Sequence, residues 1–570
     1  MTGILIAIAV FSLLYLAGWY FGNRNRNAAK QRQAEEVHDA WGMAIEKSRP
    51  WPVYHSLLTR RNESGGDYYV DENTWHDLDL YGVFEELDRT LTSAGECELY
   101  CLLRNIQIDE GVLADRDRTI SFLENNAETR RRLREILINL GRESLLIGVL
   151  ELMWDDIPSR GSLPALATVF SKVGTISLVA VILSFSLGQA WTPIAFGLLL
   201  SVYVFNTWVH YKTRSQHGPK FSAIGYLGKL VEAALEIGNL NVPEIESDTR
   251  PLKTAQDCFR LPGHARALIP FRGGLSEGLE IVQHYVAILF LTEAKGIYRS
   301  LDVIEKHQQQ LRNAFKDIGC LDAAQAVASF RTGLPVYCKP TFVSDPKCLS
   351  VTDLFHPLVN NAVSNSISLK EKGCFVLGAN MSGKSTFLRT MGINTILAQT
   401  LFTCLASEYT ASKFHVVTAI NTTDDLGEGM SLFATQAKRL LSIIESAETT
   451  KSSTLCIIDE ILNTTNNKER ICAAEQILDY LARKNGLVIV STHDLDLVRY
   501  LDRQYEKFHF QYTVKDKTLV FDYLIRSGFS DSTNAIKILS QLGYPDEIVS
   551  KTKFKIASLS GQGGSDSFPD

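Results

Sequence analysis

The sequence lacks two features that would place it in a common class of protein: an excess of positive charge and a framework of paired cysteines. Its 570 residues carry a net charge of −6 and a pI near 6.1, so no overall basic field marks it as a nucleic-acid-binding protein. The ten cysteines are scattered and most lie in apolar runs, which indicates reduced thiols in a cytoplasmic protein. A local basic surface remains compatible with this composition.

The first apolar run lacks both a basic residue before it and a small-x-small cleavage site. Residues 3–21, GILIAIAVFSLLYLAGWYF, are uncharged and about long enough to cross a bilayer as one helix, which needs roughly 20 residues. These absences favour a retained anchor over a cleaved signal peptide. Arg24 and Arg26 follow at once, so the positive-inside rule predicts the amino terminus outside and the remaining chain in the cytoplasm.

A second apolar block, residues 173–209, also lacks charge. The sequence GQAWTP at residues 188–193 splits it into two halves of about 15 to 18 residues each, which suffices for tilted or thin-bilayer helices. The connecting loop has no Lys or Arg, whereas Lys172 precedes the block and Lys212 follows it. This pattern predicts a hairpin that enters from the cytoplasm and returns there. A buried helical pair in a large soluble core is the alternative.

The segments around the hairpin show helical periodicity. Residues 87–141, 221–237 and 279–332 place apolar side chains at three- and four-residue steps, which predicts an α-helical core. Within the last segment, residues 281–291 are strongly apolar but short, so a core helix is favoured over a membrane-associated one.

One of these helices carries a basic run that consists of Arg130, Arg131, Arg132 and Arg134. Such a run usually forms a solvated helix face. The more specific alternatives are that the run binds DNA phosphates or anionic lipid headgroups.

Past Pro335 and Pro340 the composition changes to β-rich runs alternating with helices, which predicts an α/β domain with strands before helices. Residues 373–390 read GCFVLGANMSGKSTFLRT, a short apolar strand followed by a loop that matches G-x-x-x-x-G-K-[ST] at every fixed position. Such a loop holds anionic phosphate with backbone N–H groups at a helix N-terminus. The predicted nucleotide-binding loop consists of Gly378, Ala379, Asn380, Met381, Ser382, Gly383, Lys384 and Ser385.

Two residues of this loop have predicted roles of their own. Lys384 is expected to reach the β- and γ-phosphates of a nucleotide, and Ser385 is expected to ligate Mg²⁺. Farther on, residues 424–433 read DDLGEGMSLF and open a helix, whose N-terminus attracts anions. Ser431 is therefore a candidate for a phosphate contact, although spacing does not say to which phosphate.

Two further strand patterns end in residues suited to hydrolysis. The run at residues 455–458 ends in Asp459, which is suited to the Mg²⁺ shell, and Glu460, which is placed to orient or deprotonate water. The run at residues 487–490 is followed by His493, at the edge where ligands bind in parallel α/β sheets. A lone histidine is more often structural, but this context favours a role in sensing the γ-phosphate or the water.

The order of these motifs resembles that of the MutS family of mismatch-repair ATPases. GANMSGKSTFLRT is similar to the family's phosphate loop, including Asn380, Met381, Thr386 and Arg389. DDLGEGMSLF resembles the segment in which a serine, here Ser431, reaches across a dimer to the γ-phosphate in the partner's site. CIIDEI and STHDLDL match the other two nucleotide motifs. The resemblance implies an ABC/MutS-like α/β P-loop ATPase that binds ATP and Mg²⁺ and acts as a homodimer.

The resemblance extends beyond the nucleotide motifs. Residues 340–342 and 356–359 look like the start of the family's ATPase domain, and residues 534–550 are similar to its terminal dimerisation helices. Residues 87–104 resemble the start of the helical core that joins DNA clamp to ATPase. The implied fold is a P-loop domain that follows an α-helical core or lever, with three predicted transmembrane helices.

The chain departs from the family pattern in three places. Anchor and linker occupy the space upstream of residue 87, so no mismatch-reading or connector domain is expected there. The hydrophobic hairpin takes the place of the clamp insertion, and the glycine-rich segment after Glu460 becomes the polar residues 462–470. Dimeric ATP hydrolysis therefore carries over from the family, whereas mismatch recognition does not.

The predicted organisation follows from these observations. It is an anchor at 1–22, a cytoplasmic linker at 23–86, a helical core at 87–165 and 211–335 interrupted by a transmembrane hairpin at 166–210, an ATPase domain with dimerisation helices at 336–555, and a disordered tail at 556–570. We expect a multi-pass membrane ATPase whose ATPase domain lies in the cytoplasm and whose dimer closes on ATP. The alternatives are a membrane-tethered DNA-binding protein in repair-related DNA metabolism, an ATP-driven transporter, and a signalling or scaffold component with no DNA role.

Overall fold

The computed structural model of the chain contains two compact units. The helical unit comprises Met1–Ser64, Glu85–Leu102 and Ala114–Leu334, and the sheet unit comprises Gly65–Phe84, Leu103–Leu113 and Pro335–Asp570. The predicted order of a helical part followed by an α/β domain is confirmed. The structure describes residues 24, 35, 38–61, 68–157, 161–187, 190–217, 220–254, 284–379, 381–420, 432–450, 452–462, 467–515, 518–528 and 543–560.

The helical unit is built around its last helix. Its elements are α2 (Trp51–Arg61), α5 (Ser93–Arg104), α6 (Glu110–Asn125), α7 (Ala127–Leu140), α8 (Leu146–Trp154), α9 (Leu163–Leu187), α10 (Thr192–His217), α11 (Lys220–Gly238), η1 (Pro243–Ile245), α12 (Glu246–Thr254), α14 (Thr292–Lys306) and α15 (Gln308–Gly333). Residues 321–331 of α15 are buried on every side. A helical stretch that exposes no face to solvent must be surrounded by other elements, so this part of α15 lies in the core of the unit.

Glycines allow α5 to pack directly on α15. A Cβ atom at Gly95 would lie 2.1 Å from Asp322 Oδ2, and one at Gly319 would lie 2.7 Å from the carbonyl oxygen of Ala94. Any larger residue at either position would push the two helices apart. Cys97 and Cys101 are also buried in α5, as expected for reduced thiols that serve helix packing.

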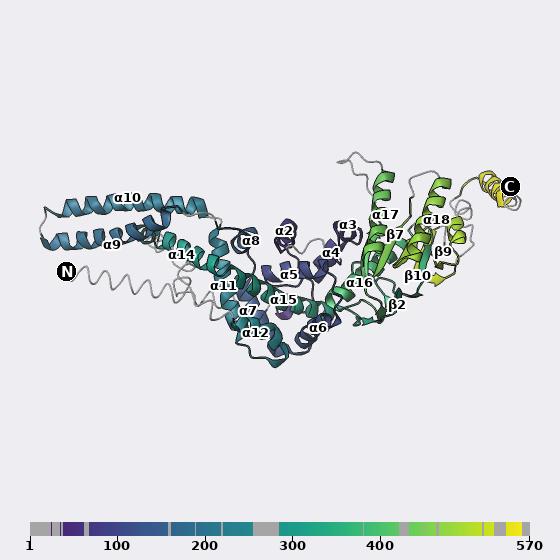
Figure 1. Cartoon of the computed structure of the whole chain (residues 1–570), viewed down its shortest axis with the longest axis horizontal. Helices are drawn as coiled ribbons and strands as arrows, with labels where there is room; N and C mark the ends of the chain where they lie inside the picture. Colours follow the sequence, from purple (N-terminus) through teal and green to yellow (C-terminus); the bar gives the residue numbers. More distant parts are fainter. Residues whose placement is uncertain are drawn as a thin grey trace. The chain divides into compact units, whose positions relative to one another are not determined.

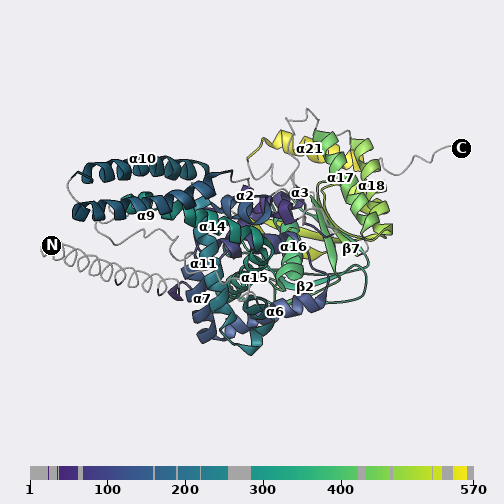
Figure 2. The ribbon, with the colours of Figure 1, turned by 60° about the vertical axis from the view of Figure 1, so that its left-hand side comes forward.

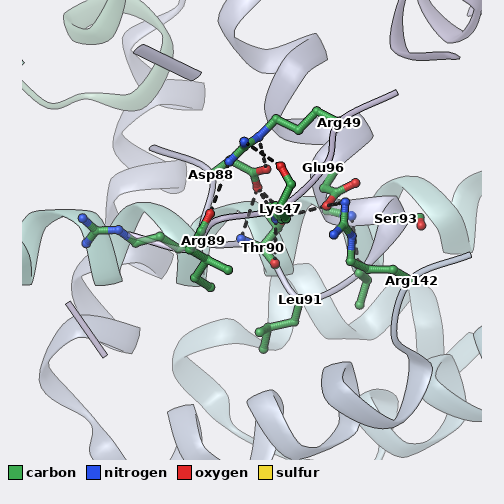
Figure 3. A network of polar contacts seen from close by, with 12 residues as sticks. Lys47, Arg49, Asp88, Arg89, Thr90, Leu91, Ser93, Glu96 and Arg142 are labelled. Carbon is green, nitrogen blue, oxygen red and sulfur yellow. Dashed lines mark hydrogen bonds and ion pairs between the residues drawn. The ribbon is translucent and has the colours of Figure 1, made fainter. Parts of the chain in front are cut away.

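An ionic network fastens the segment before α2 to the rest of the helical unit (Figure 3). Lys47 Nζ donates to Asp88 Oδ1 at 2.8 Å and lies 3.1 Å from Glu96 Oε1. Arg49 Nε donates to Asp88 Oδ2 at 3.1 Å, and an Arg142 nitrogen lies 2.6 Å from Glu96 Oε1. The side chains of Lys47 and Asp88 are 5% and 0% exposed. Removing one partner of such a buried pair costs roughly 3–5 kcal/mol, so the network fixes residues 47–61 in the packed structure.

Helices α9 and α10 form a long apolar hairpin (Figures 1 and 2). The stretches Leu163–Phe185 and Thr192–Gln216 are long and apolar enough to cross a membrane, yet only 28% and 22% of their most apolar windows are buried. Phe185 and Leu200 are 70% and 65% exposed. A helical pair in the core of a soluble protein would bury such side chains.

The structure describes two of the three predicted transmembrane helices. The first of the three, residues 3–21, lies outside the described residues. Within the part of the chain that the structure describes, two helices have the length and composition to span a membrane. These two helices are α9 and α10 of the hairpin, and each is uninterrupted over its apolar run.

The segment before α14 contacts the hairpin near the middle of both of its helices. Asn206 Nδ2 donates to the carbonyl oxygen of Leu289 at 2.7 Å, and a Cβ atom at Gly174 would lie 2.4 Å from the same oxygen. In the described part of the apolar run 281–291, residues 284–289 are helical, and Leu291 has a left-handed φ of 46°. This short helix therefore packs against the hairpin and turns into α14.

The larger sheet of the sheet unit has the strand order β10-β9-β4-β8-β7-β6, in which only the β10–β9 pair is antiparallel. Its strands are β4 (Gly373–Leu377), β6 (Phe414–Ala419), β7 (Ser453–Asp459), β8 (Gly486–Ser491), β9 (Tyr505–Lys515) and β10 (Thr518–Ser527). Strands β4 and β8 are wholly buried, as expected for central parallel strands. Ser491 pairs with both Val376 and Asp459, so the carboxyl ends of β4, β8 and β7 lie side by side.

A smaller sheet and several helices complete the sheet unit. The smaller sheet has the order β1-β5-β2-β3, with β1 (Thr341–Phe342), β2 (Cys348–Leu354), β3 (Asn365–Lys370) and β5 (Glu408–Ala411). The helices are α3 (Glu72–Asp77), the first residues of α4 (Leu80–Leu87), α16 (Lys384–Leu401), α17 (Leu432–Thr449), α18 (Asn467–Arg483), α19 (Leu495–Tyr500) and α21 (Asp546–Ser560). The unit thus includes α3, which precedes the α/β region by more than 250 residues in the sequence.

Candidate functional site

The predicted nucleotide-binding loop joins β4 to α16. Gly378 has a φ of 151°, and a Cβ atom there would lie 2.6 Å from Ser382 Oγ. Gly383 has a φ of 102° and caps α16. Both positions favour glycine, which explains why the motif requires glycine there. Asn380 lies outside the described residues.

Lys384 lies in the concave side of this loop. Its Nζ donates to the carbonyl oxygens of Gly378 and Ala379 at 2.8 and 3.1 Å, and the residue is only 5% exposed. Burial lowers the pKa of the ammonium group, and the carboxylates of Glu460 and Asp459 oppose this shift. The loop therefore surrounds a cation at the N-terminus of a helix, where an anionic phosphate is attracted by both.

A pair of oxygen ligands lies beside the loop. Ser385 Oγ, in the first turn of α16, donates to Asp459 Oδ2 at 2.5 Å, and Ser491 Oγ donates to the other carboxylate oxygen. Hydroxyl and carboxylate oxygens are the ligands that Mg²⁺ prefers, and the ion usually completes its shell with water and substrate phosphates. Ser385 and Asp459 thus fit an Mg²⁺ site, whereas the described residues contain no cluster of three His, Cys, Asp or Glu side chains suited to a metal.

The candidate base and histidine lie next to these ligands. Glu460 has a φ of 55°, and its backbone N–H donates to the carbonyl oxygen of Ser491 at 3.2 Å. His493 Nδ1 lies 3.3 Å from Glu460 Oε1. The side chain of Glu460 is 26% exposed and that of His493 is 54% exposed, so water reaches both. A carboxylate held beside an imidazole at a wet sheet edge is suited to proton transfer from water.

The remaining predicted residues differ in their placement. Met381 is 85% exposed, Ser382 is buried, and Thr386 is exposed on α16. Ser431 and the preceding residues 421–430 lie outside the described residues, as do residues 463–466 of the polar segment after Glu460. The structure therefore brings together Lys384, Ser385, Asp459, Glu460 and His493.

The loop opens into a cavity of about 780 Å³. Its lining includes the polar or charged residues Lys384, Ser385 and Glu460 and the apolar or aromatic residues Phe355, Val359 and Tyr523. The volume lies within the usual range for a small-ligand site, about 300–1,000 Å³. A lining that combines charged groups with aromatic side chains suits a ligand that carries both phosphates and a flat ring.

Sequence reasoning missed Tyr523 because its place depends on a strand irregularity. The pairing of β10 with β9 shifts register between Phe521 and Ile525, and Tyr523 adopts a φ of 56° within this bulge. Asn365 of β3 holds the bulge: its Nδ2 donates to the carbonyl oxygen of Tyr523 at 3.0 Å, and its Oδ1 accepts from the N–H of Ile525 at 2.7 Å. Bulges often redirect a side chain next to a functional site. No periodicity in the sequence signals this one.

His356 also lines the cavity and is held neutral. It is 8% exposed, and burial, assisted by the positive charge of Arg389, lowers its pKa from 6.5 to about 4. Its Nδ1 accepts from the N–H of Leu358 at 3.1 Å. An unprotonated ring is therefore part of the folded state at neutral pH.

The pKa of His356 predicts a loss of stability in mild acid. The unfolded chain takes up a proton near pH 6.5 but the folded chain only near pH 4, so stability falls as the pH drops between these values, by about 2 to 3 kcal/mol. In a His356→Asn variant the Asn amide oxygen replaces Nδ1 and this part of the pH dependence disappears. Urea unfolding at about pH 7.5 and about pH 5 measures it, with the exposed His76→Asn as control. An unchanged pH dependence in His356→Asn would contradict the assignment.

The basic run of the helical unit does not form one positive surface. Arg130 and Arg134 lie over the ring of Trp41, with 4.2 and 5.0 Å from guanidinium carbon to ring centroid, and Arg134 is buried. Arg131 and Arg132 are exposed, and each pairs with a carboxylate four residues away on α7. The solvated helix face predicted from the sequence is thus made by two of the four arginines.

Comparisons with known proteins agree with this geometry. Residues 374–560 match the family described as MutS domain V. The chain is 28% identical to the DNA mismatch repair protein MSH3 of Phaeosphaeria nodorum over 46% of this chain and 24% of that protein. It is 29% identical to the DNA mismatch repair protein MutS of Petrotoga mobilis, over 40% and 28% of the two chains, and 27% identical to that of Thermotoga maritima, over 45% and 33%. The chain spans about a quarter to a third of the length of these relatives.

Proposed function

Since the chain is a member of the MutS family, whose domain V matches residues 374–560, we propose that it binds ATP with Mg²⁺ in the 780 Å³ cavity and hydrolyses it. The observation that carries this proposal is the contact between Ser385 and Asp459 beside Lys384 and Glu460. Phosphoryl transfer to water needs a phosphate-binding loop, metal ligands and a group that positions the water, and these residues supply all three.

Each side chain has one task in the proposed reaction. The loop N–H groups and Lys384 bind the phosphates, and Ser385 and Asp459 hold Mg²⁺, which neutralises charge on the phosphate oxygens when bound. Glu460 orients the attacking water and accepts its proton, and His493 holds the Glu460 carboxylate in place. Tyr523, which lines the cavity, binds the adenine ring.

We further propose a homodimer in which Ser431 contacts the γ-phosphate in the partner's site. This proposal comes from the resemblance of residues 424–433 to the family segment and from the similarity of the chain to MutS proteins. ATP binding would then close the dimer. The helical unit is proposed to act as the lever that transmits this closure.

The hairpin of α9 and α10 is the proposed membrane attachment. Its apolar side chains are exposed, as lipid-facing side chains are, and the loop between the helices carries no charge. With the predicted anchor at residues 3–21, this gives a multi-pass protein whose sheet unit lies in the cytoplasm.

Two candidate functions differ in whether the protein acts on DNA. The relatives are DNA mismatch repair proteins, which favours a task in repair-related DNA metabolism. The pairing of Arg131 and Arg132 with neighbouring carboxylates favours the second candidate, a membrane-coupled ATPase in transport or signalling without DNA, because little unpaired charge remains on that helix.

The experiment that tests the function measures the ATPase rate of the full-length protein in lipid nanodiscs. Homoduplex, mismatched and single-stranded DNA are titrated at two salt concentrations, and Lys384→Ala, which loses the phosphate contact, is the control. Stimulation by DNA that weakens with salt supports the DNA role. A rate that is indifferent to all three DNAs supports the second candidate, and the absence of hydrolysis overturns the proposed function.

Tyr523 is expected to act on nucleotide binding and not on chemistry. In a Tyr523→Ala variant the KM for ATP rises by about 10-fold, because a stacked base is worth roughly 1–3 kcal/mol, while kcat changes little. Leu524→Ala, on the adjacent exposed residue, is the matched control. Inhibition by tripolyphosphate, which has no ring, should be the same in both variants. A weaker tripolyphosphate effect in Tyr523→Ala would show that the phosphate-binding loop had been disturbed instead.

A further inference from the structure

Helix α3 is built into the sheet unit, although it lies outside the residues that match MutS domain V. Asp71 caps the helix, since its Oδ1 accepts from the N–H of Thr74 at 2.7 Å. The guanidinium carbon of Arg104 lies 4.1 Å from the ring centroid of Trp75, and both residues are fully buried. The position of α3 is therefore determined at both ends of its first turn.

The last residue of α3, Asp77, places a fully buried carboxylate between β6 and α17. Its Oδ2 accepts from Thr418 Oγ1 and from the N–H of Ile420, each at 2.9 Å, at the end of β6. Its two oxygens also accept from an Arg439 nitrogen of α17 at 3.1 and 3.2 Å. One carboxylate thus joins the end of β6 to α17 by charge-assisted hydrogen bonds.

The backbone of the same residue reaches the helix of the nucleotide-binding loop. The carbonyl oxygen of Asp77 accepts from Arg389 Nε of α16 at 2.9 Å. Next to it, a Cβ atom at Gly392 of α16 would lie 2.8 Å from a methyl carbon of Leu78. The absence of a side chain at Gly392 lets Leu78 pack against the helix backbone, so α3 and α16 are held at close range.

We infer that Asp77 is a positioning residue of the ATP site, acting through Arg389 and Arg439. It fixes α16, which carries Lys384 and Ser385, relative to β6 and α17. The inference rests on the proposed ATPase function and deepens it, because it assigns part of the catalytic geometry to a segment outside the matched domain. Small displacements of positioned groups cost up to about 100-fold in rate, so the contacts of Asp77 act on turnover more than on nucleotide binding.

The chemistry of the carboxylate makes this inference specific. Three groups donate to the Asp77 carboxylate. They are the hydroxyl of Thr418, the N–H of Ile420 and the guanidinium of Arg439. An Asp77→Asn replacement has the same shape but turns an amide NH₂ toward at least one of these donors. The exposed Asp79, two residues on, has no such arrangement, and Asp79→Asn tolerates the left-handed φ of 51° at that position.

The test compares full-length wild type, Asp77→Asn and Asp79→Asn. Active sites are first counted by the stoichiometry of fluorescent ADP with Mg²⁺, and kcat and the KM for ATP are measured per active site. The affinity for ADP with aluminium fluoride, a transition-state analogue, is compared with that for ADP. For Asp77→Asn we expect kcat to fall by about 10-fold to 100-fold with KM within about threefold, and the analogue to bind weaker while ADP does not.

Two milder variants keep the inference testable if Asp77→Asn does not fold. Thr418→Val removes one donor, and Arg439→Lys keeps the charge but loses the fork geometry. Both should lower kcat by about threefold or more with KM unchanged. If the folded variants at Asp77, Thr418 and Arg439 have the same kcat per active site as Asp79→Asn, the inference about Asp77 is wrong, while the proposed ATPase function still stands. A wild type that binds no ADP or hydrolyses no ATP overturns the proposed function and this inference with it.

Discussion

Replacing Glu460 by glutamine should reduce ATP hydrolysis by about 10²-fold to 10⁴-fold, the usual worth of a positioned general base. Glutamine has the shape of glutamate, so the contact with His493 at 3.3 Å and the backbone turn at residue 460 remain possible. The amide does not accept a proton from water. Because Lys384 and the loop are untouched, the affinity for ATP should stay within about threefold of wild type.

The measurement is single-turnover hydrolysis of radiolabelled ATP by the full-length protein, with equilibrium binding of ATP as the second readout. Glu469→Gln is the matched control, since Glu469 is an exposed glutamate in the first turn of α18. If the Glu460→Gln variant hydrolyses ATP like the parent, Glu460 is not the general base and the catalytic part of the proposed mechanism is wrong. Loss of ATP binding together with hydrolysis would instead indicate a structural role for this carboxylate.

The second large effect concerns the hairpin. It is measured by comparing two positions whose side chains have nearly the same exposed fraction in the protein without a membrane. Ile182 in α9 is 61% exposed and Met43 in the helical unit is 64% exposed. In lipid vesicles, a cysteine at Ile182→Cys should react with a membrane-impermeant maleimide roughly 100-fold more slowly than one at Met43→Cys, because the reactive thiolate does not form in hydrocarbon. Mass spectrometry of the labelled peptides separates each site from the natural cysteines.

The control is the same pair of variants after denaturation, in which both cysteines should react at one rate. If the α9 cysteine reacts as fast as the Met43 position in intact vesicles, the hairpin lies in water and the membrane proposal is wrong. The exposed apolar side chains of α9 and α10 would then need a protein partner to cover them.

The nucleotide motifs were readable from the sequence because their physics is local. Gly378 and Gly383 are required by backbone conformations that glycine favours, and Lys384 and Ser385 follow in the first turn of the same helix. An apolar run that ends in an acidic residue predicts a buried strand with the acid at the sheet edge, as Asp459 shows. The apolar runs of the hairpin were equally readable, since length and lack of charge are sequence properties.

Other features depended on contacts between residues far apart in the chain. Tyr523 reaches the cavity through a bulge held by Asn365, which lies 158 residues away. Arg130 and Arg134 lie over Trp41, so a basic run that looks uniform in sequence is divided in the fold. Neither arrangement has a period or a motif, because each is set by which elements pack together.

The sequence by itself therefore determined the chemistry available to this protein: a phosphate-binding loop, metal ligands, a base and two apolar helices. Only the tertiary structure decided which groups surround that chemistry. The clearest case is Asp77, whose carboxylate contacts Thr418 and Arg439 more than 340 residues later. Its burial is stabilised by hydrogen bonds from these side chains, and a sequence does not show which donors will surround a carboxylate once the chain has folded.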